Sequence, residues 1–311
     1  MNTPRRLAAA AAVVCTLVMA VACGTPVEGS GASQQPQGAA LRITLGTQAF
    51  PEARILGELW RQALAVNGYT VDLKKGIGPA ADLDRMLQHG EIDGHVAYTG
   101  TVLSIVARQP VSGLDPQATY ENAREFYAGR NMAMSAMTPF ENKDAIATTR
   151  TFAQTHRLRS LADLATLPGF RLAARPEFDG LYLGTTGLAE VYGVTPASFV
   201  PVPVGQQYAA LDGGRADAVN AFTTDPQLRS GDYTVLADPE LLFGSQNAVL
   251  TVDAGKLEVV GEERFLAVVG AVNARLDQET IIDLNSRVTD GRSDVDVSRQ
   301  FLRDQGLLTP Q

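Results

Sequence analysis

The chain has 311 residues, of which 45% are hydrophobic and 19% charged, and its formal net charge is −8. That length accommodates two domains of ordinary size or one large domain, and the composition is that of a globular protein. No basic cluster interrupts the acidic sequence, so nothing in it predicts a surface that follows a phosphate backbone, and no nucleic-acid partner is expected.

The N-terminus has the pattern of an export signal. Two arginines precede an apolar run over residues 7–21, which is shorter than the roughly 20 apolar residues of a membrane span. The run ends in A-V-A-C-G, which resembles a bacterial lipobox, in which the cysteine becomes the lipid-modified first residue after cleavage. We therefore expect a signal peptide over residues 1–22 and lipidation at Cys23; a plain secretory signal cleaved near Ala22 is the alternative.

Cysteine usage agrees with an exported chain. The only other cysteine is Cys15, inside the apolar run, so the mature chain is expected to contain no disulfide and no catalytic or metal-binding cysteine beyond the lipidated one. Residues 23–40, which would begin at the lipid anchor, are rich in Gly, Ser, Gln and Pro and predict a flexible tether. As a random coil such a tether reaches about 20–25 Å, enough to hold a globular body just off a membrane surface.

From residue 41 the hydrophobic pattern alternates between strands and helices. The expected elements are a strand over 41–45, a helix from Pro51, a strand over 69–73, a helix over 80–89 and a strand from Asp93. This order predicts an α/β fold with a parallel sheet and right-handed crossovers. Trp60 lies in the apolar stripe of the first helix, so we assign it to the core.

The rest of the chain continues the alternation and indicates two lobes. The expected elements are helices over 102–107 and 116–127, an extended segment over 140–149, a partly helical stretch over 151–164, a strand over 170–174, a helix over 185–192, strands over 199–204 and 233–236, an extended segment over 247–252, and helices over 262–276, 278–288 and 295–305. The two extended segments are interpreted as crossings between lobes. Lobe I is therefore expected over 41–142 plus 248–311, and lobe II over 143–247.

Two stretches, 87–99 and 211–223, match each other under a shift of 124 positions. The identical pairs are Leu87/Leu211, Gly90/Gly214, Asp93/Asp217, Ala97/Ala221 and Thr99/Thr223. Each copy has the pattern of a helix closed by a glycine of positive φ, an aspartate that holds the turn, and a strand. Each strand ends in an aromatic ring, Tyr98 or Phe222, where ligands of open α/β sheets gather. The repeat predicts two equivalent lobes that close over a small molecule.

Polar residues near the strand ends are the candidate ligand contacts. They are the hydroxyls of Thr47, Thr99, Thr101 and Thr223 and the amide of Gln48. These groups are expected to orient a carboxylate or hydroxyl of the ligand. The rings of Tyr98 and Phe222 are expected to hold a cation over their π faces, an interaction worth about 0.5–2 kcal/mol.

The sequence contains no motif typical of a catalytic site. None of the histidines, His89, His95 and His156, has a partner at metal-ligand spacing, and no G-x-S-x-G occurs. Gly76 and Gly78 form a G-x-G without the rest of a dinucleotide motif. No catalytic residue, metal or cofactor is therefore expected.

Several motifs together resemble a known family. They are I-T-L-G-T-Q-A-F-P-E followed by I-L-G-E-L in residues 43–59, G-I-G at 76–78, G-E-I-D at 90–93, Y-T-G-T at 98–101, and A-D-A with F-T-T-D in residues 216–225. In this order they resemble the substrate-binding lipoproteins of ABC importers for osmoprotectants such as glycine betaine, choline and carnitine. The resemblance extends from about residue 41 to the closing F-L-R-D-Q-G-L. It implies a two-lobed periplasmic-binding-protein fold with a hinge and an interlobe ligand cleft.

The resemblance also implies a ligand site, with departures. Relatives surround a trimethylammonium group with four aromatic side chains, of which Tyr98 matches the first and Phe222 the fourth. Asp144 falls at the second position and Thr185 near the third, and Ala97 replaces the usual acid before Y-T-G-T. Asp144 is expected either to pair with a cation or to form a hydrogen bond with a polyol or phenolic hydroxyl, and the sequence leaves both open.

The expected function is that of a monomeric receptor on the extracytoplasmic face of the cell membrane, lipid-anchored at Cys23. Lobe closure would capture a quaternary ammonium, betaine or related polar solute and deliver it to the permease subunits of an ABC importer. Two alternatives stay open at this point: an enzyme of the lyase or dehydratase type on the same fold, and a sensory lipoprotein without a transporter.

Overall fold

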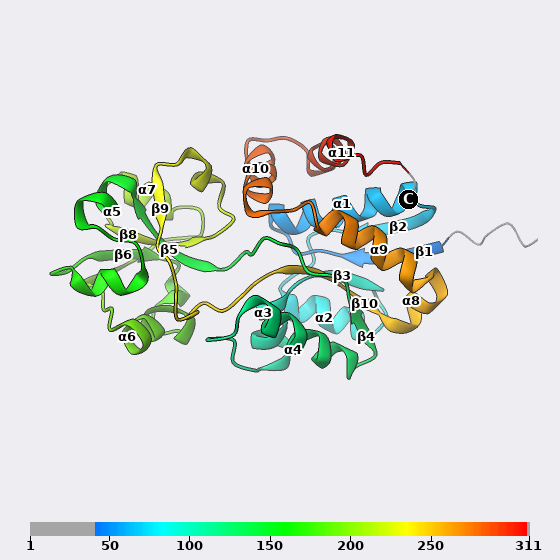
Figure 1. Cartoon of the computed structure of the whole chain (residues 1–311), viewed down its shortest axis with the longest axis horizontal. Coiled ribbons are helices and arrows are strands. Elements are labelled where there is room, and N and C mark those ends of the chain that lie inside the picture. The colour runs from blue at the N-terminus through cyan, green and yellow to red at the C-terminus, as the bar shows by residue number, and fades with distance from the viewer. Residues whose placement is uncertain (1–40, 310–311) are drawn as a thin grey trace, which may run out of the picture. The chain divides into compact units, whose positions relative to one another are not determined.

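A computed structural model describes residues 41–309 of the chain (Figure 1). The expected signal peptide over 1–22, the tether over 23–40 and the lipidation site Cys23 lie outside the described residues. Within those residues, no helix is both long and apolar enough to cross a membrane.

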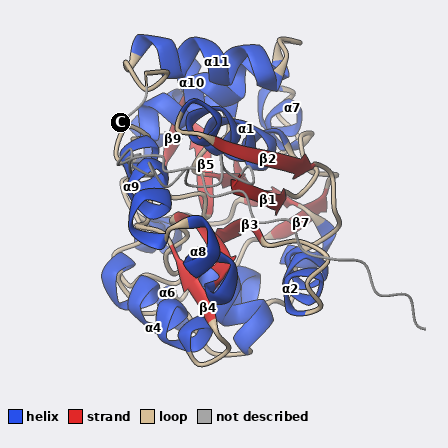
Figure 2. Ribbon diagram, turned by 90° about the vertical axis from the view of Figure 1, so that its right-hand side faces the viewer, coloured by secondary structure: helices blue, strands red, loops and turns tan. Residues whose placement is uncertain are grey.

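The first sheet has the strand order β2-β1-β3-β10-β4. Its strands are β1 (Leu41–Gly46), β2 (Tyr69–Lys74), β3 (Gly94–Tyr98), β4 (Met132–Met134) and β10 (Ala248–Asp253). Helices cover both of its faces (Figure 2). One face carries α1 (Pro51–Val66), α9 (Glu262–Asn273), α10 (Gln278–Thr289) and α11 (Asp294–Asp304); the other carries α2 (Ala80–Gln88), α3 (Thr99–Thr101), the π-helix η1 (Val102–Ala107) and α4 (Pro116–Ala128); α8 (Ala254–Val260) follows β10.

The second sheet has the strand order β7-β6-β8-β5-β9. Its strands are β5 (Asp144–Thr149), β6 (Arg171–Ala174), β7 (Ser198–Pro201), β8 (Ala218–Phe222) and β9 (Tyr233–Val235). The helical elements are α5 (Arg150–His156), α6 (Gly187–Tyr192), α7 (Gln207–Asp212), the π-helix η4 (Tyr182–Thr186) and the 3-10 turns η2 (Leu161–Thr166), η3 (Pro176–Phe178) and η5 (Pro226–Ser230). Each sheet packs on hydrophobic clusters of its own, so the chain contains separate cores.

Both sheets are mixed, which corrects the expectation of parallel sheets. β1 pairs in parallel with β2 and β3, as β6 does with β7 and β8. β10 instead runs antiparallel to β3 and β4, and β5 runs antiparallel to β8 and β9. The reason is the connectivity, because β5 and β10 continue the two segments that cross between the sheets and so enter from the opposite direction.

The aspartates of the internal repeat, expected to hold turns, each bond to the backbone of a neighbouring strand. The Asp93 carboxylate accepts a hydrogen bond from the Thr44 backbone N–H at 2.7 Å, and the Asp93 N–H donates to the Thr44 carbonyl at 2.8 Å. Asp217 makes the same reciprocal pair with Arg171, at 2.8 and 2.9 Å. Gly90, which ends α2, has a φ of +68°, where a side chain would be strained. Each copy of the repeat therefore joins two neighbouring strands of its own sheet: β3 to β1 in the first sheet and β8 to β6 in the second.

Most helices and strands lie within a few residues of their predicted bounds, and three differences have local causes. β4 spans three residues and α8 spans seven, too short for either to show a clear hydrophobic period in sequence. The helix predicted over 185–192 begins instead with the irregular η4, in which Leu183 and Gly184 leave helical geometry. Trp60 is fully buried as expected, and its indole N–H donates to Asn273 at 2.8 Å.

The crossing segments are joined to each other between the two sheets. Glu141 and Asn247 form an isolated antiparallel bridge. The hydroxyl of Thr223 donates to the Glu141 carbonyl at 2.6 Å and accepts from the Lys143 N–H at 3.1 Å. These bonds place the hinge next to the end of β8. The lobe boundaries at 142/143 and 247/248 stay a prediction.

Candidate functional site

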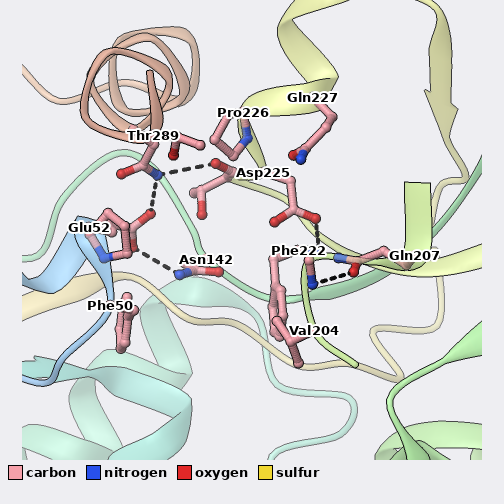
Figure 3. A pocket seen from close by; sticks show the side chains of 14 residues that line it. Phe50, Glu52, Asn142, Val204, Gln207, Phe222, Asp225, Pro226, Gln227 and Thr289 are labelled. Atoms are coloured by element: carbon pink, nitrogen blue, oxygen red, sulfur yellow. Dashed lines mark hydrogen bonds between the residues drawn. The ribbon is translucent and has the colours of Figure 1, made fainter. Parts of the chain in front are cut away.

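A cavity of about 440 Å³ lies beside the hinge. Its wall combines the start of α1, the first crossing segment, α10, and the loops after β7 and β8, so both sheets contribute to it (Figure 3). The lining residues used below are Phe50, Glu52, Asn142, Phe222, Asp225 and Asn285. This cavity is the candidate ligand site.

Glu52 is a buried carboxylate at the start of α1. Pro51 begins the helix, and the next residue turns its side chain inward, where it is 2% exposed. Its Oε1 accepts hydrogen bonds from the Tyr98 hydroxyl at 2.8 Å and the Asn142 amide at 2.9 Å, and its Oε2 accepts from the Asn285 amide at 2.9 Å. Burial raises the pKa of the Glu52 carboxyl, and the hydrogen bonds act in the opposite direction.

Tyr98 supports this carboxylate. It is 5% exposed and is not among the residues that line the cavity. Its ring centroid lies 6.0 Å from that of Phe50, and Phe50, 39% exposed, provides the aromatic wall on this side. Burial and the neighbouring Glu52 raise the pKa of the Tyr98 hydroxyl, so this group acts as a donor. Phe222 lines the cavity as expected for a contact residue, but the ring that lines the opposite part is Phe50.

Asp225 is the second carboxylate of the site. It follows β8, and its Oδ2 accepts hydrogen bonds from the Phe222 N–H at 2.9 Å and the Tyr208 hydroxyl at 3.0 Å. Burial raises the pKa of its carboxyl. No lysine or arginine is among the residues that line this cavity in the described chain. The cavity is therefore an acidic site with two phenylalanine rings.

Asp144 is paired within the protein. Arg175 contacts both of its carboxylate oxygens, at 2.6 and 2.9 Å, and Asn220 donates to it at 2.9 Å. The Arg175 guanidinium also lies 5.6 Å from the ring centroid of Phe222 and 5.3 Å from that of Phe178. The cation beside Asp144 in this structure is thus an arginine of the chain. A ligand contact at Asp144 stays a prediction.

The threonines at the strand ends bond to the backbone and to the hinge. The Thr99 hydroxyl accepts from the Asn247 N–H at 3.2 Å, and the Thr101 hydroxyl donates to Gln246 at 3.2 Å. Together with Thr223 they join the ends of β3 and β8 to the crossing segments. None of the three lines the cavity.

The remaining predicted contacts also lie away from the cavity wall. Thr47 is fully buried and donates to the Gln48 carbonyl at 2.9 Å, while the side-chain oxygen of Gln48 is buried without a hydrogen-bond partner. Thr185 lies in η4, where its hydroxyl donates to Asp179 at 3.0 Å. As ligand contacts, all three stay predictions.

Of the six lining residues used here, five were not among the sequence candidates: Phe50, Glu52, Asn142, Asp225 and Asn285. Acids at a helix start or after a strand are usually caps or solvated groups, so the sequence gives no sign that these two are buried. Asn285 lies 233 positions from Glu52, a separation at which no local pattern predicts a contact. Only the F-P-E and F-T-T-D motifs, which contain Glu52 and Asp225, marked the segments.

Comparison with known proteins identifies the family. Residues 42–304 match the model of the substrate binding domain of the ABC-type glycine betaine transport system. The chain belongs to this family. It is a family of transporter substrate-binding domains, not of enzymes, and it acts outside the cytoplasm, delivering small solutes to a permease. Within residues 41–309, no group of three or more His, Cys, Asp or Glu side chains is placed to hold a metal ion.

Relatives agree with the fold and the family. The chain is 24% identical, over 270 residues, to the ergothioneine transport permease/ergothioneine binding protein EgtU of Helicobacter pylori (strain G27), covering 85% of this chain and 48% of that protein. The chain thus spans about half the length of this curated relative. A solved glycine betaine/carnitine/choline ABC transporter structure aligns with a TM-score of 0.79 at 19% identity, over 86% of this chain and 99% of that one. The apo YehZ structure from Escherichia coli aligns with a TM-score of 0.72 at 21% identity, with the same coverage. These structures confirm the predicted two-lobed periplasmic-binding-protein fold.

Proposed function

We propose that this chain is the receptor of an ABC importer and that its cavity binds a compact organic cation, of the quaternary ammonium and betaine class or a related polar molecule. The observation that carries the proposal is the lining of the cavity. Two carboxylates, Glu52 and Asp225, and two phenylalanine rings line it, without a basic side chain to neutralise the acids. In a partly desolvated site such charges attract a cation strongly, and a ring face adds to that attraction.

A binding panel tests this proposal. The purified chain is titrated calorimetrically with glycine betaine, choline, carnitine, ergothioneine and small amines, and with uncharged polyols as controls. We expect saturable binding of at least one cation and no binding of the polyols. Binding of the polyols alone, or of nothing in the panel, would contradict the proposal.

We further propose that the chain acts as a monomer of two lobes, 41–142 plus 248–311 and 143–247, anchored in the membrane by a lipid on Cys23. The hinge bonds around Thr223 support the division into two lobes, and the A-V-A-C-G sequence supports the lipid anchor. Replacing Cys23 by serine is expected to move the chain from the membrane fraction to the soluble fraction of cells. A membrane-bound Cys23→Ser chain would contradict the anchor, and a concentration-independent dimer in solution would contradict the monomer.

A further inference from the structure

We infer that the ligand is an organic cation that lacks a carboxylate and carries N–H donors, and that Asp225 receives those donors. This inference rests on the proposed function and, within it, favours a related polar cation over the quaternary ammonium and betaine class. Glycine betaine and choline, which have no N–H group, would then be weaker ligands of this site than the corresponding primary ammonium compound.

The charges around the cavity disfavour a ligand carboxylate. Neither Arg175 nor Lys143 is among the lining residues, although Arg175 lies over the ring of Phe222 and Lys143 follows Asn142, and both of these residues line the cavity. Arg175 is neutralised by two contacts to Asp144, and Lys143 lies 3.5 Å from Glu141. A zwitterion would therefore bring a third negative group into a site that already holds two, with no lysine or arginine among the described lining residues to bind it.

The aromatic groups disfavour a fully methylated ammonium. Such a group has no N–H and depends on ring faces that surround it. Among the aromatic residues of the described chain, only Phe50 and Phe222 line this cavity, and the nearby Tyr98 is buried. Phe222 already contacts the guanidinium of Arg175. An ammonium with N–H groups instead forms charge-assisted hydrogen bonds with carboxylates, which are present here.

Asp225 is the more available of the two acids. Glu52 is 2% exposed, and its two oxygens already accept three hydrogen bonds from the protein. Asp225 is partly exposed; its Oδ2 accepts hydrogen bonds from Phe222 and Tyr208, and the Gln207 side chain is a further partner of the carboxylate. A ligand donor therefore reaches Asp225 more readily than the nearly buried Glu52.

Asn142 adds a second acceptor. Only its amide nitrogen can donate to the Glu52 carboxylate, so its Oδ1 is directed away from Glu52. Figure 3 shows this oxygen pointing toward the part of the cavity next to Phe222. The atom is buried and has no hydrogen-bond partner in the protein. A buried acceptor without a partner is costly, and a ligand N–H would satisfy it.

Stepwise methylation of one ligand tests the inference on the unaltered chain. Ethanolamine, N-methylethanolamine, N,N-dimethylethanolamine and choline keep the same hydroxyl and the same charge near neutral pH, while the number of N–H donors falls to zero. We expect the affinity to fall along the series, by at least about tenfold from ethanolamine to choline. The parallel series from glycine to glycine betaine, which adds a carboxylate, is expected to bind more weakly at every step. Equal or tighter binding of choline, or of the carboxylate series, would overturn the inference while leaving the proposed function intact; silence of every compound would overturn both.

Two matched substitutions test the role of Asp225. Asp225→Asn is expected to reduce the preference for ethanolamine over choline by about tenfold, because the loss affects the N–H ligand more. Asp212→Asn is the control, since Asp212 bonds to Tyr233 outside this cavity, and it should leave the preference unchanged. Thermal unfolding of each variant shows whether it is folded. Equal losses for the two ligands in a folded Asp225→Asn chain would show that Asp225 does not receive the N–H groups.

Discussion

At the scale of single residues, the site depends on a carboxylate that the protein has surrounded with donors. Glu52 accepts hydrogen bonds from Tyr98, Asn142 and Asn285, which come from a strand, a crossing segment and a helix. One buried charge thus fixes three side chains around the cavity, and this arrangement makes Glu52 a positioning residue as well as a source of negative potential.

Replacing Glu52 by glutamine tests this role. Glutamine keeps the size of the side chain, but its amide NH₂ would face donors of Tyr98, Asn142 or Asn285. We expect the free energy of unfolding to fall by about 1–3 kcal/mol, since a buried polar group loses its partner. Urea denaturation measures the loss, and Glu263→Gln, on an exposed residue of α9, is the control that should change stability by less than about 0.5 kcal/mol. An unchanged midpoint for Glu52→Gln would show that the network does not stabilise the fold.

The pKa values of the two acids predict a pH dependence of binding. Burial raises the pKa of both Glu52 and Asp225, so on acidification these carboxyls become protonated at a higher pH than ordinary carboxyls do. Protonation removes negative charge from the cavity, and cation affinity is therefore full well above the raised pKa values and falls as the pH drops through them. The charge of the nearby Asp144, which is paired with Arg175, also raises the pKa of Asp225, and Tyr208 remains a neutral donor because its pKa is raised.

Calorimetric titration with choline at stepped pH measures this dependence, because the charge of choline does not change with pH. The Asp225→Asn chain should show a weaker decline on acidification than the parent chain. An affinity for choline that stays constant down to the pH at which exposed aspartates titrate would contradict the prediction.

At the scale of elements, the chain stops its short helices in different ways. α5 ends at Arg157, an exposed residue in the left-handed region with a φ of +57°, where glycine is the favoured residue. α6 and α2 end instead with Gly193 and Gly90, both of positive φ. The left-handed conformation of a residue with a Cβ costs energy that glycine avoids.

Arg157→Gly is therefore expected to stabilise the chain. The gain in the free energy of unfolding should be about 0.5–1 kcal/mol, the relief of left-handed strain less the extra flexibility of glycine in the unfolded chain. Arg159→Gly is the matched control, an exposed arginine two residues further on that is not in the left-handed region, and it should be neutral or destabilising. Chemical denaturation compares the free energies of unfolding of the two variants. A lower value for Arg157→Gly than for the parent chain would contradict the prediction that Arg157 is strained.

At the scale of the whole molecule, α10 connects the two lobes beside the hinge. Gln278 donates to the Glu141 carbonyl at 3.2 Å and to the Thr223 carbonyl at 2.8 Å. Asn285 donates to the Thr224 carbonyl at 3.1 Å, and Arg229 lies 3.0 Å from Asp283. Because Glu52 also bonds to Asn285, the candidate site and this contact share one network.

Removing the Gln278 side chain should favour a more open arrangement of the unliganded chain. Three hydrogen bonds are lost, two to Glu141 and one to the Thr223 carbonyl, and only the bond to Thr223 joins the two lobes. At about 1 kcal/mol for that bond, the equilibrium between open and closed forms should shift by roughly fivefold. Small-angle X-ray scattering is expected to show a larger radius of gyration for Gln278→Ala without ligand and a return toward the parent value with ligand. Gln300→Ala is the control, because the Gln300 amide bonds to Asp304 at the end of its own helix, α11; equal curves for both variants would contradict the prediction.

The sequence by itself determined what depends on local periodicity and turn chemistry. It predicted the alternation of strands and helices and the burial of Trp60, because these follow from the spacing of side chains along each element. It did not predict that Asp93 and Asp217 join neighbouring strands, because their partners Thr44 and Arg171 lie 49 and 46 residues away. Its motifs also identified the family, and its repeat identified equivalent strands in two lobes.

Only the tertiary structure decided how the site is composed. Glu52 became the centre of the network because Asn285 and Tyr98, far from it in sequence, come within hydrogen-bonding distance. Arg175 neutralises Asp144, although Arg175 follows β6 and Asp144 begins β5, two strands that lie on either side of β8. Burial, charge pairing and long-range hydrogen bonds depend on contacts between distant segments, so a linear pattern that shows the residue types cannot show which acids remain free for a ligand.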